Sequence, residues 1–423
     1  MTDLVERYDI PEQHFWLRGP RSGPPVAFNA GTGMWNVHGY PEAQEILADP
    51  VTFSSDTTRL VPKDLLPDEF SMEGFITQID PPEHGKLRKL VSSAFTRKVV
   101  ADLEPRIAAL THELLDAARE RGRLELVADL AYPLPVIVIA ELLGVPAGDR
   151  ELFKRWADAL FQRDAQVSLA DPPPDGQAVD GQAVDGQAVD GQAVDMEAMR
   201  KASIEATMGS WQEMSAYLAE HAAERRRHPR ADLLTRLVEA EVDGERLPDH
   251  QVVNFAIILL LAGHITTTML LGNTVLCLDA FPGQQDRARA DRATVPAVIE
   301  ESLRLLTPFA ALGRSTTRPA ELGGVAIPAD SLILVWIASA NRDPRQFPAP
   351  DVFDPARDPN PHLGFGRGIH FCLGAPLARL EGRVALNILL DRINPLRTDP
   401  EDPVLFMPTA TMTGVRRLPL VLP

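Results

Sequence analysis

The longest apolar stretch of the chain limits what it can fold into. It runs from residue 252 to residue 278 and is long enough to span a bilayer as a helix. Asn254 and His264 interrupt it, together with four threonines, and its longest run without a polar residue covers only residues 255–263. We therefore expect a long helix buried in the core of a large soluble protein, rather than a membrane span.

The composition agrees with a soluble cytoplasmic protein. The chain has 423 residues, a formal net charge of −17 and 45% hydrophobic residues, which argues against non-specific binding to nucleic acid or to an anionic membrane. Its two cysteines, Cys277 and Cys372, cannot form a disulfide framework and suit a reducing compartment. The charged N-terminus lacks the apolar segment of a signal peptide. We expect a monomer with no nucleic-acid or membrane partner.

Hydrophobic spacing predicts a mostly α protein with small β-sheets, organised as a single domain over residues 1–423. Several of the helical segments begin with a capping residue or an early proline. The predicted helices cover residues 82–93, 99–121, 136–143, 149–162, 196–227, 249–279 and 295–306. The predicted strands lie within residues 25–37 and 321–337 and in a tail at 412–422.

One segment within this domain is of low complexity. Residues 175–194 repeat DGQAV four times, directly after three prolines at 172–174. Small and polar residues with one valine per repeat cannot bury enough surface to become ordered. We expect residues 172–195 to form a mobile loop between two helices, most simply a tolerated insertion without a function of its own.

A cysteine in a glycine-rich loop marks the candidate site. Gly366, Gly368 and Gly374 surround Cys372 and permit unusual backbone angles or the close approach of a flat partner. Pro376 is suited to the first turn of the helix that follows. Cys372 thus precedes a helix N-terminus, where the dipole and free N–H groups favour a thiolate.

Two chemical roles suit a cysteine in this position, a nucleophile or a metal ligand. A buried Cys is usually just a small hydrophobe, and we expect that of Cys277. Zinc would need partner ligands at short spacing, which we do not find, and the nearest candidate base, His370, is only two residues away on the same loop. A thiolate bound to haem iron would explain the flat approach that the glycines allow.

The loop resembles the haem-binding loop of the cytochrome P450 family. Residues 365–374, FGRGIHFCLG, match that family's F-x-x-G-x-x-x-C-x-G spacing, and the resemblance implies that Phe365, Gly366 and Gly374 contribute to cofactor binding. The resemblance implies that Cys372 is the proximal iron ligand and that the fold is the P450 fold. Because the chain has no C-x-x-C-H motif, we expect haem b to be held non-covalently.

The family's E-x-x-R motif is matched by Glu301 and Arg304, and the resemblance implies a buried ion pair between them. A lone E-x-x-R is weak evidence, but here it precedes FPAPDVFD at residues 347–354 and then Cys372, in the family's order. The family often carries arginine where this chain has Val352, and we expect Arg357 to supply the third charge instead.

Four residues match the family's contacts to the haem propionates. His84 and Arg88 are four residues apart and share one face of a predicted helix, as two donors to one carboxylate should. Arg314 and His370 match the remaining contacts. The alternative for the first two is a capped basic surface helix.

The segment from Ala262 to Thr267 resembles the family's oxygen-binding helix. Gly263 permits close approach to the haem, and the Thr266 hydroxyl can bond to the carbonyl of Ala262 and open a groove for O2. The alternative is a buried threonine satisfied by its own helix.

The largest departure from the family is Ile265, which occupies the position where an acid usually helps to relay protons. His264 is a poor substitute, because it points about 160° away from Thr266 at 100° per residue. Three routes remain open: ordered water with Thr266, a hydroxyl or carboxylate of the substrate, or the use of peroxide instead of O2. The retained threonine disfavours the last.

The resemblance implies a monooxygenase that hydroxylates or epoxidises an apolar small molecule, with a polyketide, macrolide or terpenoid natural product as the expected class. We find no G-x-G-x-x-G fingerprint for a flavin or nicotinamide, so electrons should come from a ferredoxin and its reductase. A basic patch could receive an acidic ferredoxin; it consists of Lys86, Arg88, Lys89, Arg97 and Lys98. The rivals are a peroxide-using haem-thiolate enzyme, a haem-binding sensor without turnover, and a non-haem protein with Cys372 as nucleophile.

By the same resemblance, the substrate pocket should be lined by four groups of residues and by the flanks of the DGQAV repeat. These groups are residues 58–78, 259–267, 309–312 and 411–412.

Overall fold

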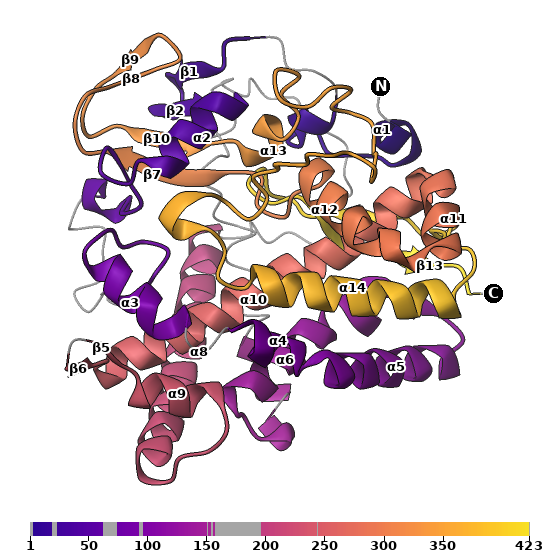
Figure 1. Cartoon of the computed structure of the whole chain (residues 1–423), viewed down its shortest axis with the longest axis horizontal. Coiled ribbons are helices and arrows are strands. Elements are labelled where there is room, and N and C mark those ends of the chain that lie inside the picture. The colour runs from indigo at the N-terminus through magenta and orange to yellow at the C-terminus, as the bar shows by residue number, and fades with distance from the viewer. Residues whose placement is uncertain are drawn as a thin grey trace.

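Helix α10 (Asp249–Ala280) is the central element of the fold, and its apolar middle is covered by other helices (Figure 1). It contacts α6, α8, α12 and α14. By length and hydropathy α10 could cross a membrane, but 78% of its most apolar 18-residue window is buried inside the protein. The expectation of a buried core helix is therefore confirmed.

The computed structural model is predominantly helical, as the hydrophobic spacing predicts. It describes residues 3–18, 23–61, 74–92, 96–149, 151–153, 155–156, 196–242 and 244–422. The predicted loop at 172–195 and most of the predicted helix at 149–162 lie outside these residues. The other described helices are α1 (Asp3–Arg7), α2 (Tyr40–Ala48), α3 (Glu83–Ser92), α4 (Arg97–Ala101), α5 (Glu104–Glu120), α6 (Pro133–Leu143), α8 (Met196–Arg227), α9 (Leu233–Glu239), α11 (Pro282–Ala290), α12 (Val295–Leu305), α13 (Ile337–Ala340) and α14 (Ala375–Arg392).

One predicted helix is wrong in its continuity. The spacing predicts a single helix over residues 99–121, but the structure has α4 and α5 with a break at residues 102–103. Pro105 lies in the first turn of α5, and its ring would clash with the carbonyl of residue 101 in a continuous helix. The chain therefore ends one helix and starts another.

A five-stranded sheet lies beside the helical layer (Figure 1). Its strand order is β1-β2-β10-β7-β3, with β10 parallel to β2 and the other neighbours antiparallel. The strand predictions at 25–37 and 321–337 fall in this sheet and in the adjacent β8–β9 hairpin. The described strands are β1 (Val26–Asn29), β2 (Met34–Val37), β3 (Phe53–Ser54), β4 (Leu124–Glu125), β5 (Glu241–Val242), β6 (Glu245–Arg246), β7 (Leu312–Thr316), β8 (Ala320–Leu322), β9 (Val325–Ile327), β10 (Leu332–Val335), β11 (Leu405–Phe406), β12 (Val415–Arg417) and β13 (Pro419–Leu420).

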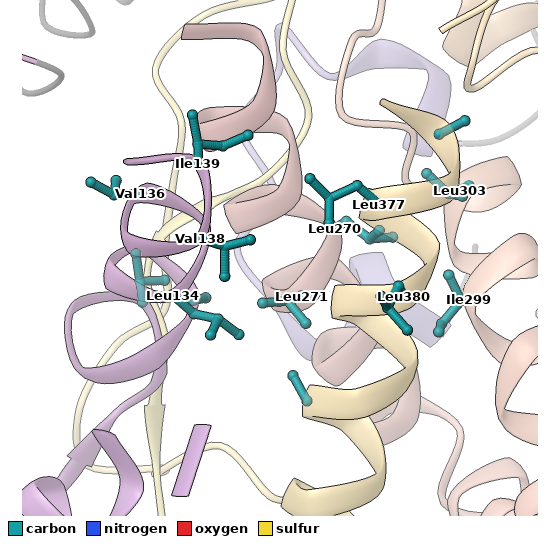
Figure 2. Packing of buried hydrophobic residues seen from close by; sticks show 14 of the residues in the cluster. Leu134, Val136, Val138, Ile139, Leu270, Leu271, Ile299, Leu303, Leu377 and Leu380 are labelled. Atoms are coloured by element: carbon teal, nitrogen blue, oxygen red, sulfur yellow. The ribbon is translucent and has the colours of Figure 1, made fainter. Parts of the chain in front are cut away.

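The main hydrophobic core lies around α10. Figure 2 shows side chains of α6 on one side of it, among them Ile139, and side chains of α14 and α12 on the other, among them Leu377 and Leu303. Leu270 of α10 lies between these groups and is 2% exposed. This packing fixes α10 and α14 against each other, and the candidate site lies where their faces meet.

Candidate active site

A large cavity lies between α10, α14 and the loop that precedes α14. The space between its walls is about 1350 Å³, including a part that is open to solvent, and the walls are mostly apolar. Cys372 and Thr266 both line it, from the loop and from α10 respectively. The structure thus brings together the two residues that the sequence singled out at positions more than 100 residues apart.

The glycines of the Cys372 loop have separate structural uses. Gly366 and Gly368 both have φ of +69°, which side chains of L-residues rarely allow. A Cβ on Gly368 would also lie within 2.4 Å of the Leu47 carbonyl oxygen at the end of α2. The Cys372 N–H donates to the carbonyl of Phe365 at 2.9 Å, which closes the loop. These glycines therefore hold the loop in shape, in addition to any close approach of a ligand.

Burial and nearby positive groups act in opposite directions on the pKa of the Cys372 thiol. Burial raises its pKa above the ordinary value. The backbone N–H groups of Gly374 and Ala375, at the start of α14, lower the pKa, as do the charges of Arg88 and Arg379. Burial has the larger effect, so the helix start alone does not produce the thiolate that the sequence analysis expects there. A bound metal cation would favour the thiolate further.

The predicted ion pair between Glu301 and Arg304 is present in the core of the protein. Both side chains are fully buried, and two hydrogen bonds of 2.8 Å join the guanidinium to the carboxylate. Arg357 lies 3.5 Å from Glu301, so the expectation of a third charge at Arg357 is also confirmed. Arg304 donates further to three backbone carbonyls, including that of Val352. The pair ties α12 to the segment that leads into the Cys372 loop.

A cluster of basic side chains occupies one end of the cavity. His84, Arg88 and His370 line the cavity wall, and the rings of the two histidines are 4.3 Å apart. Arg314 is buried behind them. Burial, together with the charges of Arg314, His84 and Arg88, lowers the pKa of His370 to about 3. The four predicted propionate contacts are therefore neighbours in the structure.

This basic cluster lacks enough negative charge of its own. The Nε2 atom of His84 is buried without a hydrogen-bond partner, and among the described residues the Arg314 side chain donates only to the carbonyl of Gly313. Burial lowers the pKa of Arg314 to about 10, while Asp80 acts in the opposite direction. Buried cations without carboxylate partners are unfavourable, so this end of the cavity suits a ligand that brings anionic groups.

Helix α10 presents Thr266 to the cavity in the geometry expected from the sequence. The Thr266 hydroxyl donates to the carbonyl of Ala262 at 2.7 Å. Ala262, Gly263 and Thr266 all line the cavity. A Cβ on Gly263 would lie 2.9 Å from the end of Ile139, so the missing side chain also lets α6 pack closely against α10. Gly263 therefore has a packing role that the sequence analysis does not predict.

Neither of the two residues before Thr266 is placed to transfer protons to it. Ile265 is 6% exposed and packs in a small cluster with Met269, Met407 and Met412. His264 is fully buried against the ring of Tyr132, and burial lowers its pKa to about 3. His264 is thus neutral at physiological pH, and its exclusion from a relay agrees with its placement.

Much of the predicted pocket wall is found in the cavity, with one correction. Ile76, Thr77, Leu259, Phe309 and Leu312 line it. Residues 411 and 412 do not: Met412 forms a β-bridge with Phe309 and belongs to the buried cluster that contains Ile265. The wall formed by α12 and α14 is missing from the prediction.

Glu381 is the most notable cavity residue that the sequence analysis misses. It is on α14, buried, and lines the cavity. The available signal was its position four residues after Leu377, on the apolar stripe of the helix, where a carboxylic acid is unexpected.

The donor set fits an iron porphyrin. A single thiol at one wall matches a haem-thiolate ligand, and the unpaired basic cluster matches two propionates. Within the described residues, no group of three His, Cys, Asp or Glu side chains converges to hold a metal ion, so Cys372 stands as a lone protein ligand. Fold and site together define a helical haem-thiolate protein.

Comparison with known proteins leads to the same class of protein. The family model for Cytochrome P450 matches residues 192–419, and the chain belongs to the cytochrome P450 family. It is 42% identical to cyclomarin C epoxidase of Salinispora arenicola, over 96% of this chain and 94% of that protein. It is 43% identical to erythromycin C-12 hydroxylase of Saccharopolyspora erythraea, over 96% and 93% of the two chains.

Solved structures give the same fold. The hydroxylase HmtN, involved in himastatin biosynthesis, is 50% identical and superimposes with a TM-score of 0.83 over the full length of both chains. HmtT, also involved in himastatin biosynthesis, is 52% identical with a TM-score of 0.84, over 99% of each chain. The protein is therefore a cytochrome P450 monooxygenase, whose family uses a haem-thiolate cofactor, O2, redox partners and small-molecule substrates.

Proposed function

We propose that the protein is a monomeric cytoplasmic enzyme of one domain that hydroxylates or epoxidises a neutral, apolar natural product, with electrons from a ferredoxin and its reductase. The observation that carries this proposal is that Cys372 and Thr266 line the same large, mostly apolar cavity. When bound, a non-covalent haem b supplies the oxidising chemistry, which consumes O2, two electrons and two protons.

Cys372 holds the haem from the loop side of the cavity as a thiolate. The N–H groups of Gly374 and Ala375 point at its sulfur and stabilise negative charge there. Phe365 and Gly366 fix the loop, the first by accepting the Cys372 N–H and the second by its left-handed backbone. Glu301 and Arg304 anchor the segment before it.

The basic cluster binds the two propionates. His84 and Arg88 come from one face of α3, while Arg314 and His370 come from β7 and from the turn before Cys372. Arg88 also donates to the carbonyl of Phe371 at 2.7 Å, which joins this cluster to the loop. Two anionic groups here would pair with cations that otherwise lack carboxylates.

Thr266 lies on the opposite wall of the cavity, where it would orient the O2 that takes part in the reaction. Its hydroxyl is held by the carbonyl of Ala262 and can exchange this partner for a molecule in the cavity. Because Gly263 has no side chain, α10 can pack closely against Ile139 of α6. We assign Thr266 the task of holding a proton at Oγ1 close to the reacting molecules.

The cavity supports a neutral substrate. Its walls are mostly aliphatic, and its basic groups gather at the end assigned to the propionates. Arg59, which could have clamped a carboxylate, is instead bonded to Ser315 and Asp330. The relatives that act on erythromycin and cyclomarin C support a bulky product of secondary metabolism, and the first of them favours a macrolide over a terpenoid.

The electron donor should approach the Cys372 side. Lys86, Lys89, Arg97 and Lys98 are exposed there on α3 and α4, in a protein of net charge −17. Phe371, next to Cys372, is 41% exposed. A basic surface around an exposed aromatic ring suits a small acidic protein such as a ferredoxin.

The absorption spectrum of the reduced protein with carbon monoxide tests the proposal. We expect a strongly red-shifted Soret band, as a thiolate ligand produces. A Soret band at the position given by histidine or a neutral thiol would contradict the role of Cys372. Product formation with O2, ferredoxin and reductase, using compounds first selected by a spin-state shift, then separates an enzyme from a sensor.

A further inference from the structure

A second glutamate–arginine pair lies beside the Cys372 loop, and the proposed function does not use it. Glu300 directly precedes Glu301 on α12, but its partner is Arg379 of α14, the helix that packs against α12. The Arg379 guanidinium donates two hydrogen bonds to the Glu300 carboxylate, of 2.7 and 2.8 Å. Two parallel bonds of this kind fix the orientation of the guanidinium as well as its position.

His362 holds the Glu300 carboxylate from the segment that leads into the Cys372 loop. The His362 side chain is buried, and its Nδ1 atom accepts a hydrogen bond from the N–H of Gly364 at 3.1 Å. The hydrogen of the neutral ring is therefore on Nε2, which donates to Glu300 at 3.0 Å. The contacts with Arg379 and His362 outweigh burial and lower the pKa of Glu300 to about 2, so the carboxylate is ionised at neutral pH.

Arg379 also contacts the Cys372 loop itself. Its guanidinium carbon lies 4.5 Å from the centre of the Phe365 ring, which is a cation–π arrangement. Phe365 is buried, and its carbonyl accepts the Cys372 N–H. A ring that lies against the guanidinium keeps water off that face, so the charge of Arg379 is screened less there than on its exposed side.

The charge of Arg379 acts on the sulfur of Cys372. It lowers the pKa of the thiol, and the thiol in turn raises the pKa of Arg379. Arg88 also lowers the pKa of Cys372, but it belongs to the basic cluster, whose charge the two propionates would neutralise. Arg379 is therefore a cation whose effect on the sulfur would persist with haem bound, reduced only by the carboxylate of Glu300.

A charge near a thiolate ligand changes how readily the iron accepts an electron. One electron from the ferredoxin reduces the ferric haem and leaves the ferredoxin oxidised, while no bond forms or breaks and no proton moves. This step adds one negative charge to the iron and its ligands, so a nearby cation favours the reduced state and a nearby carboxylate opposes it. Arg379 and Glu300 should therefore have opposite effects on the same equilibrium.

We propose that Arg379 raises the reduction potential of the haem through the Cys372 thiolate, and that Glu300 and His362 position its guanidinium and limit the effect. Arg379 acts through the sulfur and not on the substrate, so it is a positioning residue. The pair thereby sets how favourable the first electron transfer from the redox partner is. This inference rests on the proposed function, because it requires a haem bound to the thiolate.

The first test is a spectroelectrochemical titration of the haem-loaded protein. In Arg379→Leu we expect the ratio of ferrous to ferric haem at a fixed electrode potential to fall about 3- to 10-fold, as the loss of one partly screened unit charge several ångströms away predicts. Glu300→Gln keeps an acceptor for the guanidinium but removes the negative charge, so the ratio should rise above that of the wild type. Arg379→Lys keeps the charge and should restore most of the wild-type ratio.

The second test measures the C–O stretching frequency of the reduced carbon monoxide complex, which needs no electrode. A cation near the thiolate withdraws electron density from the iron, which weakens donation from the iron into carbon monoxide and raises the stretching frequency. We expect a lower frequency than in the wild type for Arg379→Leu and a higher one for Glu300→Gln.

The pair of Arg383 and Glu104 gives a matched control on the same helix. It also has two hydrogen bonds between guanidinium and carboxylate, of 3.0 and 2.7 Å, and is exposed to a similar degree. Arg383 lies one turn farther from Cys372 along α14, which is about 6 Å. Arg383→Leu should therefore leave both the reduction potential and the stretching frequency unchanged.

A wild type without the red-shifted Soret band would overturn the proposed function itself. With a normal Soret band, an unchanged potential in Arg379→Leu would overturn only the role of Arg379. Shifts of the same sign in Arg379→Leu and Glu300→Gln would do the same, as would an equal shift in Arg383→Leu.

If Arg379→Leu fails to retain haem, Glu300→Gln decides, because it removes no cation and keeps an acceptor for the guanidinium. A potential at or below that of the wild type in Glu300→Gln would then contradict the proposal. Loss of haem in both variants would make the pair a structural link between α12 and α14 and would also contradict it.

Discussion

The two walls of the cavity are built on different principles. The Cys372 wall is a loop whose shape depends on backbone conformation: two glycines with positive φ, a closing hydrogen bond to Phe365, and the N–H groups at the start of α14. The Thr266 wall is one face of a regular helix, where side chains alone decide the chemistry. A loop of this kind tolerates little change, whereas a helix face can exchange an acid for Ile265 and keep its geometry.

Replacement of Cys372 should have the largest effect, because it removes the lone protein ligand of the loop wall. In Cys372→Ser we expect complete loss of the red-shifted Soret band of the reduced carbon monoxide complex and no detectable product. Cys277→Ser is the matched control, since Cys277 is buried on α10 away from the cavity, and it should keep the band. A red-shifted band in Cys372→Ser would show that a different ligand is used.

The anchor of the loop wall comes next. Arg304→Leu leaves the fully buried Glu301 carboxylate with only the more distant Arg357 as a cationic partner, and we expect the free energy of unfolding to fall by about 3–5 kcal/mol. Urea denaturation followed by circular dichroism measures this. The exposed pair of Lys98 and Asp102 is the control, and Lys98→Ala should change stability by less than about 0.5 kcal/mol. Equal effects of the two variants would contradict the anchoring role.

The basic cluster should show a smaller effect on haem retention. Arg314→Leu removes one buried cation opposite a propionate, and we expect haem to be lost roughly 10- to 100-fold faster. Haem transfer to apomyoglobin gives this rate. Because Arg314 makes no ion pair in the described part of the chain, the haem-free variant should be at least as stable as the wild type. A haem-free variant that is much less stable would indicate a structural role instead.

The last effect concerns the helix wall and depends on pH. The folded protein holds a proton on Glu381 up to a pKa of about 8, while the unfolded chain releases it near 4.5. Stability is therefore unaffected below that range and falls as the pH rises through it, by at most about 1.4 kcal/mol per pH unit from this group.

Glu381→Gln should remove this contribution, so that its stability exceeds that of the wild type increasingly from pH 5 to pH 8. Urea unfolding of the haem-loaded proteins at several pH values checks the difference. A constant difference across this range would mean that the carboxyl is ionised in the folded protein.

The loop wall could be predicted from the sequence, and the helix wall only in part. Cys372, Glu301 and the four basic residues each match a motif of the cytochrome P450 family, and it is this resemblance that implies their proximity. The same holds for Thr266, whose bond to Ala262 follows from helix geometry. The packing environment of Ile265 could not be predicted, because two of the methionines that surround it, Met407 and Met412, come from a distant C-terminal segment.

Glu381 and the break between α4 and α5 are two features that hydrophobic periodicity alone does not predict. Pro105 could have indicated the break, but the apolar spacing on both sides of it is continuous. Glu381 could be placed on an apolar stripe from the sequence, yet whether that stripe faces protein or cavity depends on how α14 packs against α10. Helix periodicity predicts which residues share one face of a helix, but not whether that face packs against protein or lines a cavity.

The contact between Gly368 and the end of α2 has a consequence for biosynthesis. The Cys372 loop packs against a carbonyl near the N-terminal end of the chain, and the cavity walls come from segments between residues 76 and 381. During translation, the thiol emerges only after the preceding 371 residues have been synthesised. The site can therefore bind its cofactor only after the N-terminal strands and helices have been made, and these must remain able to receive the loop until then.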